Sequence, residues 1–275
     1  MRNNLTKRDG GFIRKTNINK IGEGIIFTSN KDIFRKLILE KFKSEEFKTN
    51  TDFAKIIAWR NKTIMSANKI IRDELFGKNS DIIELGDILM GYRSVRSSNN
   101  RHNIIDNSAD YRVVGKTELQ ENKYHIKGYL VKLREDLAHG RFKFKEVFII
   151  DSNDYENLHK YAELHDHYRD IGKQTKEIGS WKKYYEFRKN NVLMKSIFKH
   201  KNGFDRNKHD IINKDIDYGF AITGHKSQSS TYTHVGIILD DIEMNPITKE
   251  KNQILYVGLT RPTTSAIVLT NDDEL

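Results

Sequence analysis

A polar turn follows a short apolar strand in residues 219–232, which read GFAITGHKSQSSTY. Thr223, His225 and Lys226 supply a hydroxyl, an imidazole and an ammonium group within four positions. Side chains at the carboxyl end of a strand face the crevice where open α/β sheets bind ligands. Groups of these types suit a phosphodiester backbone. Such a turn is also typical of a solvated surface loop, so taken alone it leaves both interpretations open.

Two further stretches contain an arginine directly after an apolar element. Residues 255–261 read LYVGLTR at the end of a predicted helix, and residues 54–62 read AKIIAWRNK, with Arg60 after a predicted strand. In their order along the chain, the three stretches resemble motifs IV, V and VI of superfamily 1 DNA helicases. They are closest to the RecD/Dda-type branch and to the UvrD-like helicase C-terminal domain. The resemblance extends over residues 22–269.

The resemblance implies a role for each matched residue. Arg60 and Arg261 would reach the γ-phosphate of ATP and neutralise the charge that develops as it leaves. The DNA backbone would be contacted by Thr223, His225, Lys226 and Ser227. The nucleotide would lie near Gln228, Ser229 and Thr231. Ordinary structural roles are also open for the arginines: a surface ion pair for Arg60, and a contact with helix-end carbonyls for Arg261.

Three residues depart from the family pattern. Ser229 stands where the family usually has glycine, and Thr231 stands where relatives often have a glutamate that could hold the ribose. A serine in a turn that needs a positive φ carries a steric cost. Pro262 replaces the usual alanine and ends the motif VI helix directly after Arg261. The first two departures weaken the expected contact with nucleotide.

The triphosphate-binding motifs are missing from the sequence. No stretch matches G-x-x-x-x-G-K-[ST], and residues 21–27 (IGEGIIF) lack both the spacing and the lysine. Asp240 and Asp241 follow a predicted strand but lie between motifs V and VI, so we expect a solvated strand end there. Family helicases hold ATP and Mg²⁺ on a first RecA-like domain. We therefore expect both to be bound mainly by an N-terminal helicase half outside this chain, and no ATP hydrolysis by the chain alone.

An alternation of strands and helices surrounds these motifs and predicts an α/β fold. The resemblance implies a RecA-like second helicase domain of the P-loop NTPase type over residues 22–85 and 210–275. Its strands are expected at 24–27, 54–59, 219–223, 235–239 and 265–270, and its helices at 31–43, 63–76 and 252–260, with a short helix before residue 231. Short strands over 86–151 predict an inserted small β-barrel that resembles the Src-homology-3 type. Two helices, at 154–171 and 181–198, form a helical insertion over 152–209, and residues 1–21 read as a flexible basic lead-in.

The composition narrows the classes of partner and chemistry. The 275 residues include 48 Lys+Arg against 38 Asp+Glu, which gives a formal charge of +10 and favours phosphate-bearing partners such as single-stranded DNA. AT-rich coding DNA would also enrich lysine and asparagine. The absence of cysteine excludes disulfides and thiolate chemistry. No long apolar run or signal peptide is present, so we expect no membrane contact and a cytoplasmic location in a bacterial or phage-infected cell.

Two other groups of side chains are candidates for metal binding and for base stacking. His165 and His167 would point about 200° apart on a helix and cannot share a metal ion, so no metal site is expected and these histidines are predicted to be solvated. Aromatic residues interleave with lysines and arginines over residues 168–188 and suit the stacking of single-stranded bases. About half of these rings are needed for the core of the two helices.

The sequence therefore predicts the C-terminal portion of an ATP-dependent 5′-to-3′ DNA helicase, of a family that acts in DNA replication, repair and recombination. Its partners would be single-stranded DNA and an N-terminal helicase half in cis or in trans. The alternative is a non-enzymatic single-stranded nucleic-acid-binding module or a decayed helicase remnant. Ser229 and the missing half favour this alternative, whereas Arg60 and Arg261 favour the motor.

Overall fold

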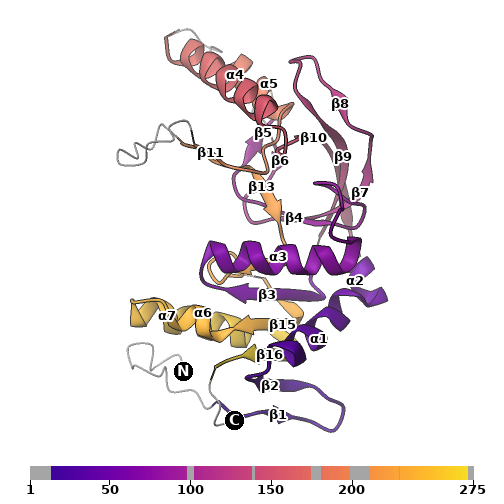
Figure 1. Ribbon diagram of the computed structural model, residues 1–275, viewed down its shortest axis with the longest axis vertical. Coiled ribbons are helices and arrows are strands. Elements are labelled where there is room, and N and C mark those ends of the chain that lie inside the picture. Colours follow the sequence, from indigo (N-terminus) through magenta and orange to yellow (C-terminus); the bar gives the residue numbers. More distant parts are fainter. Residues whose placement is uncertain are drawn as a thin grey trace. The chain divides into compact units, whose positions relative to one another are not determined.

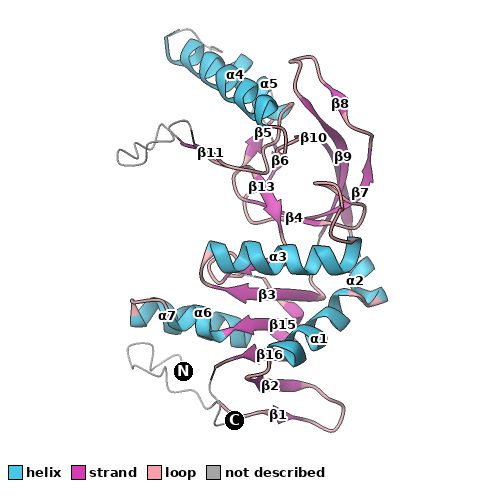
Figure 2. Cartoon of the chain, viewed as in Figure 1, coloured by secondary structure: helices cyan, strands magenta, loops and turns pink. Residues whose placement is uncertain are grey.

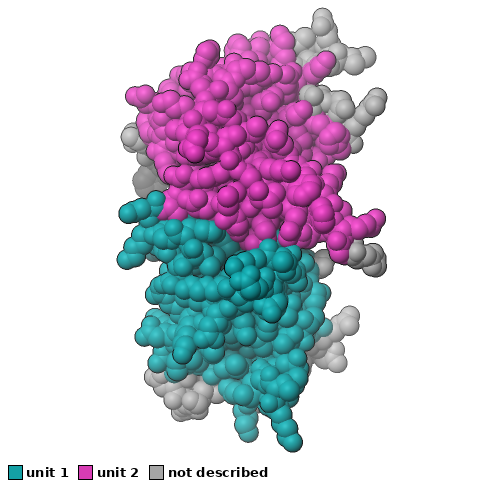
Figure 3. All heavy atoms as spheres, turned by 90° about the vertical axis from the view of Figure 1, so that its right-hand side faces the viewer, with its two compact units in different colours: residues 1–79, 219–275 teal, residues 80–218 magenta. Residues whose placement is uncertain are grey.

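The chain divides into two compact units, which are described separately. The computed structural model describes residues 14–97, 102–137, 140–174, 181–198, 211–228 and 230–271. One unit comprises Met1–Asn79 with Gly219–Leu275, and the other comprises Ser80–Tyr218 (Figure 3). The second unit is thus inserted between two segments of the first.

The first unit is built on a six-stranded sheet (Figures 1 and 2). Its strands lie in the order β1 (Asn17–Ile18), β2 (Gly24–Thr28), β16 (Pro262–Leu269), β15 (Tyr232–Ile238), β3 (Ala54–Ala58) and β14 (Ala221–Thr223). All neighbours are parallel except β1 and β2. Its helices are α1 (Lys31–Phe42), α2 (Glu45–Thr49), α3 (Asn61–Phe76), α6 (Leu239–Glu243) and α7 (Thr248–Thr260). The predicted α/β class with a parallel sheet is confirmed.

Helices cover both faces of this sheet. A Cβ built on Gly236 of β15 would lie 3.2 Å from side-chain atoms of Phe34 and Ile38 on α1. The next residue, Ile237, approaches Gly258 of α7 instead, with its Cδ1 3.3 Å from the equivalent Cβ position. Successive residues of a strand point to opposite faces. The two helices therefore lie on opposite faces. All five residues of β3 are buried, and Lys55 among them donates from its Nζ to the Gly219 carbonyl over 2.8 Å.

The second unit contains an antiparallel sheet and a pair of helices. The sheet runs β10 (Phe142–Ile150), β9 (Lys127–Asp136), β7 (Asp110–Lys116), β4 (Ile88–Gly91) and β13 (Ile216–Tyr218), and β8 (Gln120–Glu121) pairs with β9. Two-stranded pairs are formed by β5 (Val95–Arg96) with β6 (Asn103–Ile105) and by β11 (Ile197–Phe198) with β12 (Ile211–Ile212). The helices are α4 (Tyr155–Gln174) and α5 (Lys182–Lys189). These pairings do not establish the predicted Src-homology-3 type of barrel.

Three local expectations differ from the structure. The helix expected over 181–198 ends at Lys189, because the Asn190 and Asn191 side chains donate to the carbonyls of Glu186 and Phe187, and β11 follows. No helix forms among the described residues of the turn that follows β14. Residues 210–218, expected in the α/β part, include β13, which pairs with β4 of the inserted sheet.

Part of the predicted flexible lead-in is ordered. Asn17 and Ile18 form β1, which pairs with the start of β2. The Asn19 side chain accepts hydrogen bonds from the backbone N–H groups of Ile21 and Glu23 and so closes the turn between the strands. Residues 1–13 lie outside the described residues.

Candidate functional site

The carboxyl ends of β3 and β14 bring two of the predicted motifs together. Thr223, the last residue of β14, lies opposite Ala58, the last residue of β3, and the Gly224 N–H donates to the Ala58 carbonyl over 3.1 Å. Arg60 follows β3 by two residues. The turn residues His225 and Lys226 therefore lie at the same sheet edge as Arg60, although more than 160 positions of sequence separate them.

The turn after β14 is held by its own hydrogen bonds. The Thr223 carbonyl accepts from the N–H groups of Lys226 (2.9 Å) and Ser227 (3.2 Å), and the Thr223 hydroxyl accepts from Lys226 over 3.3 Å. Ser227 is fully buried, and its hydroxyl donates to the Gly224 carbonyl over 2.8 Å. The predicted contact of Ser227 with DNA does not fit this placement, because its side chain closes the turn from inside.

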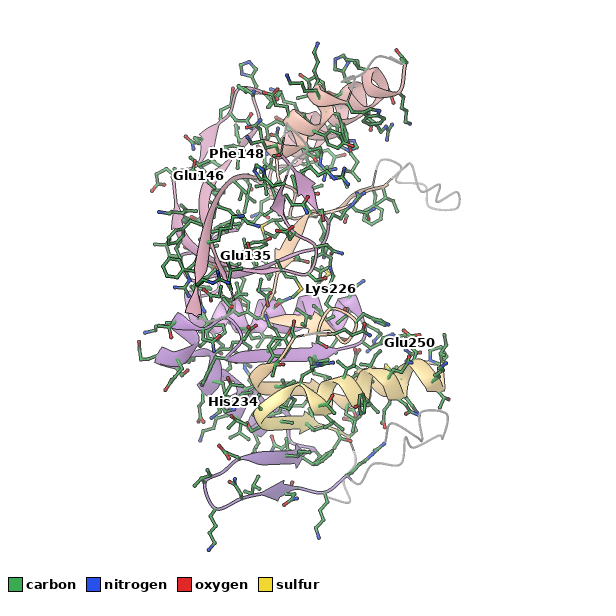
Figure 4. All side chains as sticks on the ribbon, turned by 180° about the vertical axis from the view of Figure 1, so that it is seen from behind. Glu135, Glu146, Phe148, Lys226, His234 and Glu250 are labelled. Carbon is green, nitrogen blue, oxygen red and sulfur yellow. The ribbon has the colours of Figure 1, made fainter. Side chains whose placement is uncertain are left out.

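His225 and Lys226 are more accessible. The His225 side chain is 56% exposed, and its Nε2 lies 3.4 Å from the Glu250 carboxylate of α7. Lys226 is half-buried and extends from the same turn, and Figure 4 labels both Lys226 and Glu250. The turn thus presents an imidazole and an ammonium group at the carboxyl edge of the sheet.

Asp241 organises the start of α3 and was missed by the sequence analysis. This carboxylate is 3% exposed and accepts hydrogen bonds from the backbone N–H groups of Trp59 (2.7 Å) and Arg60 (2.8 Å). It also accepts from the Thr63 hydroxyl and from Arg60 Nε, the latter over 2.6 Å. The expectation of a solvated strand end is therefore wrong for Asp241. Its position directly after a predicted strand was the only sequence signal.

The Asp241 contacts fix Arg60 while leaving its side chain accessible. The Arg60 side chain is 45% exposed, whereas that of Asp241 is 2% exposed. Burial alone would raise the pKa of Asp241, but the hydrogen bonds from Thr63, Arg60 and Trp59 together lower it below 3.8. Asp241 is thus a permanent anion at neutral pH, and Arg60 extends from the carboxyl edge of the sheet.

Arg261 lies at the opposite edge of the sheet. It follows α7 and directly precedes β16, and its carbonyl accepts from Tyr232, the first residue of β15, over 3.0 Å. The side chain is half-buried, and its Nε is buried without a hydrogen-bond partner among the described residues. A buried donor without a partner is costly unless a ligand or water satisfies it.

The structure does not bring Arg60 and Arg261 together. The two ends of β15 lie about 20 Å apart at about 3.3 Å per residue, with Arg261 beside its start and Arg60 beyond its end. Arg60 is in addition tied to Asp241 at the carboxyl edge. The expectation that both arginines reach one γ-phosphate does not fit these positions, because parallel strands put their amino and carboxyl ends at different edges.

The residues expected near nucleotide are divided between the two edges. Gln228 is exposed at the end of the turn after β14, and Ser229 lies outside the described residues. Thr231 is exposed and directly precedes β15, so it lies at the amino edge, where the Tyr232 N–H meets Arg261. Thr231 and Arg261 therefore form one group, and Thr223, His225, Lys226 and Arg60 form another.

Metal and membrane signals are weak in the described part of the chain. No cluster of three or more histidine or acidic side chains there could hold a metal ion, and no helix there is long and apolar enough to span a membrane.

The prediction of a solvated His165 is wrong. This side chain is 5% exposed, its Nε2 lies 3.1 Å from the Tyr184 hydroxyl, and burial lowers its pKa to about 4.

Comparisons with known proteins give structural likenesses only. No protein-family model matches the chain, and no curated protein matches it. The chain is similar to the crystal structure of Pif1 helicase from Candida albicans, with 12% identity, a TM-score of 0.39, and coverage of 88% of this chain and 50% of that one. It is also similar to Pif1 helicase from Bacteroides in complex with ADP-AlF3 and ssDNA, with 14% identity, a TM-score of 0.36, and coverage of 87% and 45%. The chain spans about half the length of these two proteins.

Proposed function

We propose that this chain is the second, RecA-like half of a superfamily 1 DNA helicase. In this proposal the carboxyl edge of the parallel sheet binds single-stranded DNA, and Arg261 at the amino edge contacts ATP that an N-terminal half holds. The observation that supports it most is the division of the motif residues into two groups, one at each edge of a single sheet. A motor needs such a division because DNA and nucleotide must be bound at separate places.

The carboxyl edge has the chemistry of a phosphate-binding strip. Arg60, His225 and Lys226 supply cationic or ionisable groups, and Thr223 supplies a hydroxyl. Asp241 neutralises part of the Arg60 charge but leaves its guanidinium group accessible. Contacts of this type fix the position of a nucleic-acid strand without reading its sequence. In this proposal Arg60 therefore belongs to the DNA-binding group rather than to the ATP-binding group.

The amino edge has two side chains suited to a phosphate. The half-buried Arg261 side chain would present its guanidinium group to a phosphate oxygen at this edge. Bound ATP would supply the transferable γ-phosphate, and Arg261 would stabilise the charge that develops on it. Thr231 lies at the same edge and offers a hydroxyl. Mg²⁺ would be held by the N-terminal half, because the described residues offer no carboxylate cluster for it.

The turn between β14 and β15 would couple the two edges. It leaves the carboxyl end of β14 at Gly224 and reaches the amino end of β15 at Thr231. A shift of this short connection on nucleotide binding would move His225 and Lys226 relative to the strand they hold. The resemblance to the RecD/Dda branch supports stepping in the 5′-to-3′ direction and work in DNA replication, repair or recombination in a bacterial or phage-infected cell.

Reconstitution with a P-loop-bearing half tests this proposal. We expect no ATP hydrolysis by the chain alone, and DNA-stimulated hydrolysis when a first domain of a RecD/Dda-type helicase is added in trans or joined by a linker. Arg261→Ala should then lower turnover by about 10³- to 10⁵-fold, the range known for arginine fingers. Arg60→Ala is the matched control, because it should weaken DNA binding and leave the maximal turnover at saturating DNA within a few-fold. Full activity of the Arg261→Ala protein would contradict the assignment.

A non-enzymatic nucleic-acid-binding module is the second candidate. The missing phosphate loop and Ser229 in place of glycine favour it. This candidate predicts that the chain binds single-stranded DNA and that no added half restores hydrolysis. The place of Arg261 at the amino edge favours the motor, since a module that only binds DNA has no use for a phosphate donor away from the DNA-binding edge.

A further inference from the structure

Two exposed phenylalanines lie side by side on the antiparallel sheet of the inserted unit. Phe142 is 58% exposed and Phe144 is 49% exposed, and they occupy alternate positions of β10. Their ring centroids are 5.3 Å apart, with the planes inclined at 62°. Alternate residues of a strand share one face, so both rings point to the same side of the sheet. Val147 and Ile149 point to the other side and pack in the core.

Helices cover the other end of this face. Phe148 and Ile150, further along the same row of β10, pack with Leu158 and Tyr161 of α4. Glu146, which Figure 4 labels together with Phe148, lies between the covered end and the exposed pair. The helices thus shield one end of β10 and leave the Phe142 end open to solvent. Contiguous exposed aromatic surface of this kind marks an interaction site more often than scattered apolar residues do.

Cationic side chains border the rings. The Nζ of Lys132 on β9 lies 4.7 Å from the centroid of the Phe144 ring. Arg134 lies directly opposite Phe144 in the β9–β10 register, and Arg112 of β7 lies directly opposite Arg134. Arg112 is only 5% exposed, so we call Phe142, Phe144, Lys132 and Arg134 the stacking face.

The stacking face carries charged groups of both signs. Burial, and next the neighbouring Arg134, lower the pKa of Arg112 to about 10, because this side chain is only 5% exposed and lies beneath the face. Asp136 pairs with Arg134, with Nε and Oδ1 2.8 Å apart, and Glu146 lies opposite Lys132. Two accessible cations, Lys132 and Arg134, thus face two carboxylates, and the positive charge that attracts a polyanion is the net +10 of the whole chain.

This combination fits single-stranded nucleic acid better than a protein surface. Bases stack on exposed aromatic rings whatever their sequence, and the phosphates that follow them pair with lysine and arginine. A protein partner would bury the charged groups, and charged residues are depleted in the cores of protein interfaces. Aromatic rings exposed on a β-sheet are also the surface on which several β-sheet modules stack the bases of single strands.

We propose that the stacking face of the inserted unit binds bases of single-stranded DNA on Phe142 and Phe144, as a second DNA contact in addition to the one proposed for the parallel sheet of the first unit. For the identity of the ligand this inference rests on the proposed function. The stretch of aromatic and basic residues over 168–188, which the sequence analysis considered for base stacking, is the weaker candidate, because Phe187 is fully buried and packs against Tyr161 and Tyr168.

Binding of a fluorescent oligo(dT) to the full chain tests the inference. Phe142→Ala/Phe144→Ala should weaken the affinity by at least about fivefold, the lower end for loss of one stacked base. The dependence of affinity on salt should stay the same, because no phosphate contact is removed. Phe198→Ala is the matched control, since Phe198 is 65% exposed on β11 of the same unit, and it should bind like the parent chain.

A second variant covers the case in which the double alanine protein does not fold. Phe144→Trp keeps an aromatic ring, so it should retain affinity and show an additional change in tryptophan emission when oligo(dT) is added, beyond that of Trp59 and Trp181. Unchanged affinity of a folded double alanine variant, an equal loss in the Phe198→Ala control, or no additional emission change in Phe144→Trp would each overturn the inference.

The Lys226→Ala variant separates this inference from the proposed function. If Phe142→Ala/Phe144→Ala loses affinity while Lys226→Ala leaves affinity and salt dependence unchanged, the stacking face stands and the proposed DNA contact at the carboxyl edge fails. The reverse result removes the stacking face and leaves the proposed function in place.

Discussion

Asp241 connects two segments that lie far apart in the sequence. It follows β15, yet its carboxylate accepts hydrogen bonds from Trp59, Arg60 and Thr63 at the start of α3. A negative charge near a helix N-terminus interacts favourably with the helix dipole. Arg60 forms no side-chain cap of its own, and the N–H groups bound by Asp241 belong to the two residues directly before α3. Asp241 therefore fixes the segment that leads into the helix and at the same time orients Arg60.

The substitution Asp241→Asn should destabilise the first unit by about 1 to 3 kcal/mol, the range for a buried group that loses hydrogen-bond partners. The pKa of Asp241 is below 3.8 in the folded protein, so its contribution is complete above pH 3.8 and is lost as the pH falls through the lowered value. Urea unfolding at pH 7 and at pH 3 measures this: the difference between parent and variant should shrink at pH 3.

Asp240→Asn is the matched control for this substitution. Asp240 precedes Asp241 and is half-buried, and its Oδ1 accepts from the Asn271 N–H over 2.8 Å. Because it lacks the contacts with the start of α3, its replacement should cost clearly less than that of Asp241. Equal losses of unfolding free energy in the two variants would show that the hydrogen bonds of Asp241 contribute no more to stability than that of Asp240.

Residue types and local position were sufficient to find part of the site. Thr223, His225 and Lys226 lie at the carboxyl end of a strand, as their place in the sequence predicts. Asp241 could not be found in this way, because its partners are 178 to 182 positions away. The placement of Arg60 and Arg261 at different edges could not be predicted either, since a motif match gives no information on which edge of a sheet a residue occupies.

The turn after β14 depends on close packing against α7. A Cβ built on Gly224 would lie 2.5 Å from Cγ2 of Ile254, which is closer than real Cβ contacts allow. Ile254 is itself buried at 3% exposure. The glycine is therefore needed for a close approach of turn and helix, and this approach sets where His225 and Lys226 emerge.

Gly224→Ala should displace this turn, lower the free energy of unfolding by about 1 to 3 kcal/mol through overpacking, and weaken binding of oligo(dT). Combining it with Ile254→Ala should cost less than the sum of the two single losses, because the smaller residue removes the clash. Chemical denaturation of the four proteins gives this coupling. Gly115→Ala is the control, since the nearest atom there is Lys132 Cβ at 3.4 Å, and additive losses would contradict the packing argument.

Most elements of the parallel sheet follow from sequence patterns, whereas their ends depend on tertiary contacts. The helix expected at 31–43 and the strand expected at 54–59 correspond closely to α1 and β3. The local signals are Asn30, which caps α1, and the four apolar residues among the five of β3. The helix expected at 181–198 was too long, because nothing in its composition indicates that Asn190 and Asn191 turn back on the helix.

At the scale of the whole molecule, each unit contains its own buried residues. The two apolar clusters built on β9, β10 and α4 consist of residues from Ile83 to Ile216 and lie entirely within the inserted unit. The sequence predicted an insertion from the change in strand spacing. It could not predict that Ile216–Tyr218 belongs to the inserted sheet, because this short strand gains its partner only when the chain returns to β4.

A chain with a net charge of +10 attracts any polyanion, so DNA binding alone does not identify a localised contact. Salt dependence distinguishes diffuse attraction from a localised contact, because each phosphate contact with single-stranded DNA contributes about 0.7 to the slope of log affinity against log salt. Lys226→Ala should therefore reduce this slope by about 0.7. Lys36→Ala, which removes an exposed lysine from α1 of the same unit, should leave the slope nearly unchanged. Equal changes in the two variants would mean that the charge acts as a whole and that the carboxyl edge has no distinct DNA contact.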